Sequence, residues 1–232
     1  MKHRSIAIDG PSGAGKSTLA KLLAQELGFL YVDTGAIYRT VGLAVRNRGI
    51  DPSDASAVTM LLPELEITIG YGESGLQHMH LDGEDVTEAI RQNVISDYAS
   101  KVSPIPEVRE FLMEMQRKTA REHSVIMDGR DIGTVVLPQA DLKIFLTAAP
   151  EARAERRCRE LLERGQQADY DQVLREVVER DRRDTQRLTA PLRQAEDAVL
   201  VDTTGLNLAD SLRRLMDLVQ NRPGFGKGQA DE

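Results

Sequence analysis

The fold of this chain is decided close to its start, by Gly10-Pro11-Ser12-Gly13-Ala14-Gly15-Lys16-Ser17-Thr18. These residues fit G-x-x-x-x-G-K-[ST], the pattern of a phosphate-binding loop. Glycines let backbone N–H groups turn inward around an anion, and the start of a helix adds partial positive charge. Lys16 can reach the outer phosphates, and the Ser17 hydroxyl can ligate Mg²⁺. We therefore expect residues 10–18 to bind a nucleoside triphosphate.

The flanks of this stretch support that interpretation. Ser5-Ile6-Ala7-Ile8 is a short apolar run that is typical of a buried strand, and apolar residues recur at helical spacing from Leu19 to Leu27. Strand, loop and helix in this order are the context that the motif requires. The alternative is a glycine-rich turn that caps a helix and leaves Lys16 in solvent, and the two flanks disfavour it.

Composition narrows the class of protein. A chain of 232 residues, 41% hydrophobic and 29% charged, can hold one α/β domain with insertions. The net charge of −7 argues against general nucleic-acid binding, and the single cysteine, Cys158, excludes an internal disulfide. No secretion signal or membrane-length apolar run is apparent. We expect a soluble cytoplasmic enzyme with no nucleic-acid or membrane partner, and nothing in the sequence requires more than a monomer.

Buried strands alternate with helices along most of the chain. Further strands are predicted at 29–33, 124–127, 142–146 and 198–201, and helices at 34–49, 94–101, 108–121 and 208–219. This alternation predicts an α/β fold with a five-stranded parallel sheet and helices on both faces. Two runs of alternating apolar and polar residues, 65–71 and 77–81, flank Gly72-Glu73-Ser74-Gly75 and predict a small antiparallel insert. Residues 222–232 lack periodicity and are predicted to be a disordered tail.

A magnesium-supporting carboxylate is expected beyond a strand end, because ligands of open α/β sheets bind there. Asp128 follows an apolar strand and resembles the aspartate that supports Mg²⁺ in phosphate-loop enzymes. Asp9 and Asp33 compete for this role. An aspartate that only caps a turn is the simpler alternative for Asp128.

Arginine is concentrated in one segment: eleven of the 23 arginines lie between Arg153 and Arg193. A first helix carries arginines at spacings that can share one face: Arg153, Arg156, Arg157 and Arg164. We predict that this helix is a lid over triphosphate oxygens. The alternative is a solvated surface helix whose arginines pair with neighbouring glutamates.

A second arginine-rich helix follows the first. Its predicted buried stripe consists of Leu174, Val177 and Val178. Arg180, Asp184 and Arg187 fall together on one flank of the stripe, where side chains can line a cleft beside the core. The alternative for Arg180 and Asp184 is an i,i+4 ion pair on a solvated helix face.

Four segments together resemble the bacterial cytidylate kinases of the nucleoside monophosphate kinase superfamily. They are Ile8–Ser17, Asp33-Thr34-Gly35-Ala36-Ile37-Tyr38-Arg39, Asp128-Gly129-Arg130-Asp131-Ile132-Gly133-Thr134-Val135-Val136 and Arg180-Asp181-Arg182-Arg183-Asp184-Thr185-Gln186-Arg187. The segments occur in the expected order and extend the resemblance from residue 5 to about 220. The phosphate loop alone is widespread, whereas its combination with the other segments is specific.

The resemblance implies one phosphate-loop kinase domain over residues 1–221. Its core would comprise 1–33, 108–150 and 195–221, with a monophosphate-binding region and β insert at 34–107 and an Arg-rich lid at 151–194. The implied reaction is transfer of the γ-phosphoryl group of ATP to CMP or dCMP, with Mg²⁺ as cofactor. Longer bacterial members of the family carry a β-rich extension where the insert lies here.

The resemblance also implies roles for individual residues. Lys16, Asp128, Arg130 and Arg187 would be catalytic, Ser17 would ligate the metal, and residues 10–18 with Arg153 and Arg157 would contact ATP. Thr34, Ser100, Arg109 and Asp131 would lie around the cytosine. Arg39, Arg130 and Arg187 would hold the acceptor phosphate, and Arg180 and Asp184 the sugar. Thr34 stands where the family often has serine, which preserves the hydroxyl but adds a methyl group near the base.

Two other classes of function remain open at this stage. Another small-molecule kinase on the same core, of the uridylate, adenylate or shikimate type, would share the phosphate loop. An ATP-dependent regulatory switch would also bind a triphosphate, whereas a GTPase is disfavoured because no N-K-x-D motif occurs.

Overall fold

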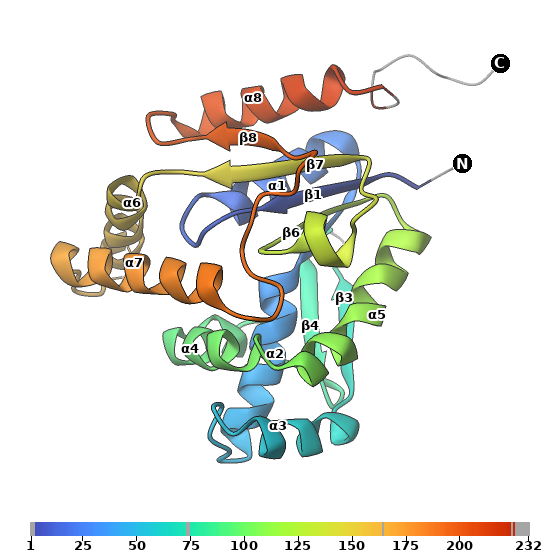
Figure 1. Cartoon of the computed structure of the whole chain (residues 1–232), viewed down its shortest axis with the longest axis vertical. Coiled ribbons are helices and arrows are strands. Elements are labelled where there is room, and N and C mark those ends of the chain that lie inside the picture. The colour runs from blue at the N-terminus through green and yellow to red at the C-terminus, as the bar shows by residue number, and fades with distance from the viewer. Residues whose placement is uncertain (1–2, 73–74, 164, 224, 226–232) are drawn as a thin grey trace.

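A computed structural model describes residues 3–72, 75–163, 165–223 and 225. Its central sheet has the strand order β2-β6-β1-β7-β8 (Figure 1). The strands are β1 (Ser5–Asp9), β2 (Leu30–Asp33), β6 (Val125–Gly129), β7 (Leu142–Thr147) and β8 (Val199–Asp202). Every neighbouring pair is parallel, which confirms the predicted five-stranded parallel sheet.

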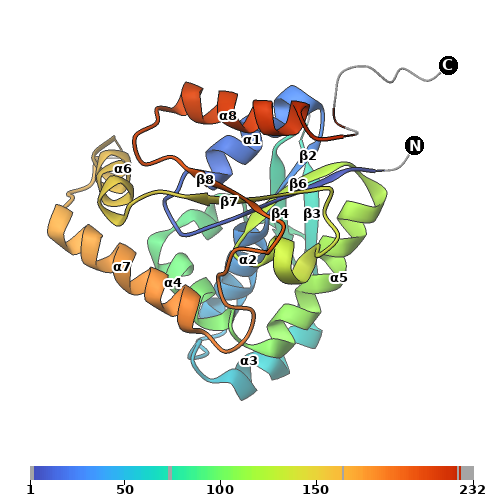
Figure 2. The same ribbon diagram turned by 45° about the horizontal axis from the view of Figure 1, so that its top comes forward.

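Both faces of the sheet are covered, and this explains why its strands are continuous apolar runs. Helices α1 (Lys16–Leu27) and α8 (Leu208–Gln220) lie over one face (Figure 2). Ile6 and Ile8 of β1 point into the core on that side, whereas Ala7 belongs to the core on the other side. Alternate residues of one strand therefore serve two cores.

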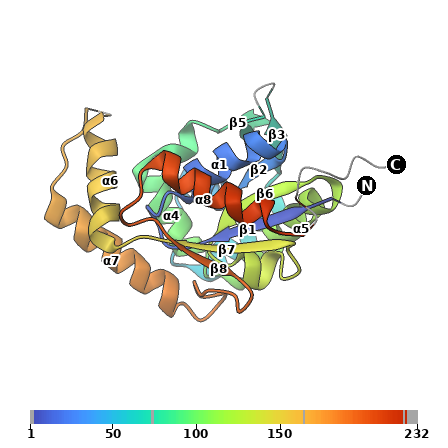
Figure 3. The same cartoon turned by 90° about the horizontal axis from the view of Figure 1, so that it is seen from above.

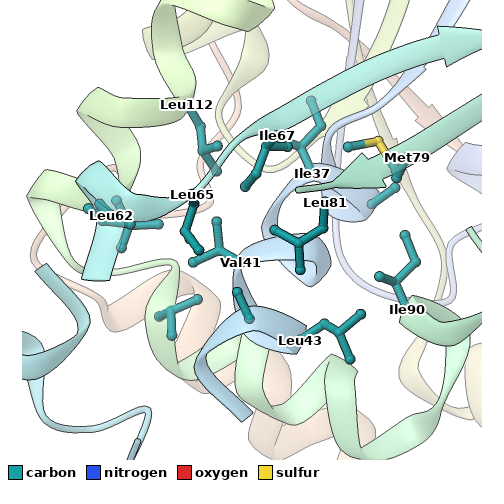
Figure 4. Packing of buried hydrophobic residues seen from close by; sticks show 14 of the residues in the cluster. Ile37, Val41, Leu43, Leu62, Leu65, Ile67, Met79, Leu81, Ile90 and Leu112 are labelled. Carbon is teal, nitrogen blue, oxygen red and sulfur yellow. The ribbon is translucent and has the colours of Figure 1, made fainter. Parts of the chain in front are cut away.

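The second core holds most of the remaining helices and the insert. It contains side chains from α2 (Thr34–Asn47), α3 (Ala55–Leu61), α4 (Asn93–Val102) and α5 (Pro106–Glu122). The predicted hairpin is confirmed as β3 (Ile67–Tyr71) and β4 (Gln77–Leu81), to which β5 (Glu84–Asp85) adds a short third strand. Glu73 and Ser74 of the predicted turn lie outside the described residues. Met79 and Leu81 of the insert and Ile37 and Val41 of α2 belong to this core (Figure 4).

Helices α6 (Pro150–Glu163) and α7 (Tyr170–Gln186) pack against each other beyond the carboxyl end of β7 (Figure 3). The predicted buried stripe of α7 is wrong. Leu174 and Val177 are only half-buried and Val178 is 50% exposed, whereas Val173 is the apolar residue of this helix that is buried. Because α7 lies at the edge of the molecule, its inward face continues from Val173 through charged residues, of which Asp184 is buried.

The C-terminal end of the chain makes contacts past the predicted boundary at residue 221. Arg222 Nε donates a hydrogen bond to the Asp141 carbonyl, at 3.1 Å, and the Phe225 ring lies 6.2 Å from the Phe29 ring. The disordered tail predicted from residue 222 therefore does not include these two residues. Residues 224 and 226–232 lie outside the part of the chain that the structure describes. Within the described part, no helix has the length and apolar composition needed to span a bilayer.

Candidate active site

The phosphate loop connects β1 to α1 and depends on glycine at its two ends. Gly10 has φ 150°, and a Cβ atom there would lie 1.9 Å from the Leu146 carbonyl oxygen of β7. Gly15, the residue before α1, has φ 89° in the left-handed region. A larger residue would be strained at either position, because β7 leaves no space at Gly10 and L-residues avoid this φ at Gly15. The loop is therefore compact and lies directly at the N-terminus of α1.

Lys16 and Ser17, the first residues of α1, lie near the carboxyl end of β6. Lys16 is buried, and its Nζ donates a hydrogen bond to the Pro11 carbonyl at 2.8 Å. Burial and the nearby positive charge of Arg130 lower the pKa of Lys16. The Ser17 hydroxyl donates to Asp128 Oδ2 at 2.9 Å. A hydroxyl and a carboxylate, the oxygen ligands that Mg²⁺ prefers, thus lie together beside the phosphate loop.

The other two candidate aspartates have different partners. Both carboxylate oxygens of Asp9 accept backbone N–H groups, from Ile132 at 2.8 Å and Gly133 at 2.7 Å. Asp33 caps α2 by accepting from the Ala36 N–H at 2.9 Å, and it pairs with Arg39. Among the described residues, Asp128 is the member of this trio that bonds to Ser17.

Four arginines, Arg39, Arg130, Arg180 and Arg187, converge beyond the strand ends, and three of them face a carboxylate. Arg130 Nε donates to Asp184 Oδ2 at 2.8 Å. Arg39, Arg180 and Arg187 each have a buried nitrogen that lacks a hydrogen-bond partner among the described residues: Arg39 Nε, Arg180 Nε and Arg187 Nη2. Burial and the charge of Arg130 lower the pKa of Arg180 to about 10. Buried guanidinium nitrogens that lack a hydrogen-bond partner among the described residues, on arginines that lie together, suit an anionic ligand.

Asp131 lies between two further arginines. Its carboxylate accepts a hydrogen bond from Arg109, whose guanidinium carbon is 5.8 Å from the centre of the Tyr38 ring. Arg187 Nη2 is 3.5 Å from Asp131 Oδ1, within reach of charge attraction but without hydrogen-bond geometry. Burial outweighs these positive charges and raises the pKa of Asp131.

The remaining predicted acceptor residues lie around the same region. The Thr34 hydroxyl donates to the Asp128 carbonyl at 2.7 Å, so it is fixed between β2 and β6. Ser100, Asp184 and Arg187 line a pocket of about 380 Å³ between the ends of α4 and α7. The sequence segments from residues 33, 128 and 180 are therefore brought together by the fold.

The structure separates the two lid arginines that were predicted to contact ATP. Arg153 is buried and donates to the Ser12 carbonyl of the phosphate loop and to Asp181 of α7, both at 3.0 Å. Arg157 points elsewhere: it donates to Asn93 of α4 at 2.9 Å. Arg164 lies outside the described residues. The contact between Asp181 and Arg153 is not predicted by the sequence, because neither the neighbours of Asp181 nor its spacing indicates it.

Comparison with known proteins decides the family. The family model described as cytidylate kinase matches residues 6–221. The chain belongs to the cytidylate kinase family. A cytidylate kinase of Caldicellulosiruptor bescii is 53% identical over 218 residues, 94% of this chain and 96% of that one. A cytidylate kinase of Streptococcus pneumoniae is 43% identical over 222 residues, 96% of this chain and all of that one.

The family named by the sequence motifs is thereby confirmed. As a member of the cytidylate kinase family, the chain is an enzyme whose activity is phosphorylation of CMP and dCMP, and it uses ATP. An uncharacterized protein from Eubacterium ventriosum, of known crystal structure, is 12% identical in sequence to this chain, and the two structures align with a TM-score of 0.53. That alignment covers 95% of this chain and 100% of the other, and it shows a shared fold.

Proposed function

We propose that the chain transfers the γ-phosphoryl group of ATP directly to the phosphate of CMP or dCMP, in a cleft with a donor half and an acceptor half. The donor half is the phosphate loop with Lys16. The acceptor half is the arginine cluster beyond β2 and β6. The observation that carries this proposal is the set of buried guanidinium nitrogens, on Arg39, Arg180 and Arg187, that have no hydrogen-bond partner in the part of the chain that the structure describes. Such donors suit phosphate and sugar oxygens at close range.

In the donor half, the residues present fit a magnesium ion. Ser17 and Asp128 would hold it, directly or through water, because Mg²⁺ takes few protein oxygens and completes its shell with water and substrate phosphates. The ion would neutralise charge that develops between the phosphates. Residues 10–18 would bind the ATP phosphates, Arg153 would support them through Ser12, and Arg157 would act from the lid.

In the acceptor half, three groups of residues would bind the three parts of CMP. Arg39, Arg130 and Arg187 would hold its phosphate, and Arg180 and Asp184 its sugar. Thr34, Ser100, Arg109 and Asp131 would surround the base. A carboxylate at Asp131 accepts a hydrogen bond from the cytosine amino group, whereas it repels the carbonyl that uracil has at that position. This charge pattern supports cytosine as the preferred base.

The reaction needs no dedicated general base, because the phosphate oxygen of CMP is already anionic. Lys16, Arg130 and Arg187 would hold donor and acceptor in line and stabilise the negative charge of the transition state. The α6–α7 pair would exclude water, which would otherwise accept the phosphoryl group.

An ADP-release assay with separate acceptors tests the proposal. We expect release with CMP and dCMP, and much less with UMP, AMP or shikimate. Lys16→Ala should lower kcat by about two to four orders of magnitude, because a preorganised charge at the reacting phosphates is lost. Lys118→Ala, which removes an exposed lysine of α5, is the matched control and should not change kcat. Release without any acceptor, or near-normal kcat of Lys16→Ala, would contradict the proposal.

A further inference from the structure

The β insert, strands β3 to β5, contacts the acceptor half of the cleft through Gln77, the first residue of β4. Gln77 Oε1 accepts the Asp33 N–H at 2.7 Å, and Gln77 Nε2 donates to the Asp33 carbonyl at 3.3 Å. One side-chain amide thus pairs with both backbone groups of one residue. Asp33 ends β2, a strand at the edge of the main sheet, so the amide satisfies backbone groups where the sheet offers no further strand.

Asp33 determines the position of Arg39. Its Oδ1 caps α2, and its Oδ2 accepts a hydrogen bond from Arg39 Nη2 at 2.8 Å. The space is tight, because a Cβ atom on Gly35 would lie 3.0 Å from both Arg39 Nη1 and Asp33 Oδ1. Arg39 Nε, in contrast, is buried and has no hydrogen-bond partner among the described residues. Asp33 therefore sets the direction of the Arg39 guanidinium, and Gln77 in turn holds the backbone of Asp33.

Gln77 itself is fixed by packing. Ile67, Met79 and Leu81 of the insert share a core with Ile37 and Val41 of α2 (Figure 4). The insert and α2 are therefore packed together, and the Gln77 end of β4 reaches the β2–α2 junction. Gln77 is half-buried, and holding its side chain at two points costs side-chain entropy. The two hydrogen bonds to Asp33 offset that cost.

We propose that Gln77 is a positioning residue of the acceptor half, through which the insert holds Asp33 and thereby aims the Arg39 guanidinium at the phosphate of CMP. The inference rests on the proposed role of Arg39 in holding that phosphate. It gives the insert a function in acceptor binding that involves no contact with the nucleotide.

The variant Gln77→Met tests this inference, because methionine keeps the length of the side chain and removes both hydrogen bonds. We expect KM and the equilibrium Kd for CMP to rise about tenfold, because Arg39 is no longer held toward the CMP phosphate, while the Kd for ATP stays within about twofold. Gln77→Asn is a second variant that keeps an amide too short to span both groups, and it should show the same selectivity for CMP. His78→Gln, on the same strand, removes the imidazole that contacts Asp85 and should change neither constant.

A double-mutant cycle with Arg39→Ala distinguishes positioning from general support of the fold. If Gln77 acts through Arg39, Gln77→Met should have little further effect on the Kd for CMP in the Arg39→Ala background. Additive effects, an unchanged Kd for CMP in Gln77→Met, or equal weakening of CMP and ATP would each overturn the inference. An Arg39→Ala variant with normal CMP binding would instead overturn the proposed role of Arg39, so the two failures are distinguishable.

Discussion

Asp9 links the two halves of the cleft with a single side chain. It is the last residue of β1, and Gly10 begins the phosphate loop directly after it. Its carboxylate holds the N–H groups of Ile132 and Gly133, which follow Asp131 in the chain. Desolvation outweighs these hydrogen bonds and raises the pKa of Asp9 to about 6. The segment after Asp131, in the proposed acceptor half, is therefore anchored beside the phosphate loop.

This raised pKa predicts a pH dependence of stability. Between about pH 4 and pH 6 the folded state binds a proton at Asp9 more tightly than the unfolded state does, so the contribution of Asp9 falls as the pH rises through that window. The fall should be about 3 kcal/mol in the free energy of unfolding. We expect the free energy of unfolding of the wild type, measured by urea unfolding, to fall by about 3 kcal/mol relative to that of Asp9→Asn between about pH 4 and pH 6. Parallel pH curves for the two proteins would contradict the assignment.

At the scale of elements, Arg153 connects α6 and α7 to the phosphate loop. Its guanidinium, buried on α6, contacts Asp181 of α7 and the Ser12 carbonyl. The backbone of Ala148, between β7 and α6, accepts a third hydrogen bond at 2.8 Å. Ala154 of α6 and Val173 of α7 are also buried, so this ion pair adds to apolar packing on the two helices. Arg153 therefore connects α6, α7 and the phosphate loop through one buried side chain.

Breaking that contact should be costly. We expect Arg153→Met to lower the free energy of unfolding by about 3 kcal/mol, because it leaves Asp181 without its partner and two carbonyls without a donor. Arg153→Met with Asp181→Leu should lose less than the sum of the single changes, and urea unfolding measures both. Arg182→Met, which breaks an exposed pair with Glu179 on the same helix, is the control and should leave stability unchanged within error. A similar loss in this control would contradict a special role for Arg153.

Local patterns were sufficient to predict most elements. The phosphate loop, the five strands and the hairpin follow from short apolar runs, glycines and alternation, and the fold and the family are confirmed. The roles of the individual site residues stay predictions. The segments around Asp33, Asp128 and Arg180 could be grouped because parallel strands deliver their carboxyl ends to one edge.

The missed features depend on contacts between residues far apart in the chain. Gln77 and Arg153 act on backbone carbonyls or N–H groups of other segments, and no spacing in the sequence encodes such partners. The inward face of α7 was predicted from its apolar residues. Because α7 lies at the edge of the molecule, Asp184 is buried and Val178 is exposed. The two-residue strand β5 is too short to show an alternating pattern.

At the scale of the whole molecule, the two ends of the described chain meet at the amino end of the sheet, opposite the cleft. The Arg4 guanidinium lies 5.6 Å from the centre of the Phe225 ring, and Phe225 packs on Phe29. Asp141, just before β7, accepts a hydrogen bond from Arg4 at its carboxylate and another from Arg222 at its backbone carbonyl. These contacts lie at the end of the sheet opposite the proposed cleft.

We expect Phe225→Ala to lower the free energy of unfolding by about 1–2 kcal/mol, because an aromatic pair and a cation–π contact are lost. KM and kcat should not change, since the cleft lies at the other end of the strands. Thermal unfolding measures the change in stability, and the ADP-release assay measures KM and kcat. Leu208→Ala, at a half-exposed apolar position of α8, is the control for removing surface apolar area. A change in KM for either nucleotide would contradict the separation of the two ends.

The strand order has a consequence for the protein while it is being synthesised. β1 and β2 emerge from the ribosome first, yet they do not pair with each other, because β6 lies between them. Gly10 also depends on β7 for the backbone surface against which it packs. A nascent chain that ends before β7 has neither a complete sheet nor a supported phosphate loop, so long-range pairing must precede ATP binding. Competence to bind nucleotide is therefore acquired late in translation, when residues from both halves of the chain are present.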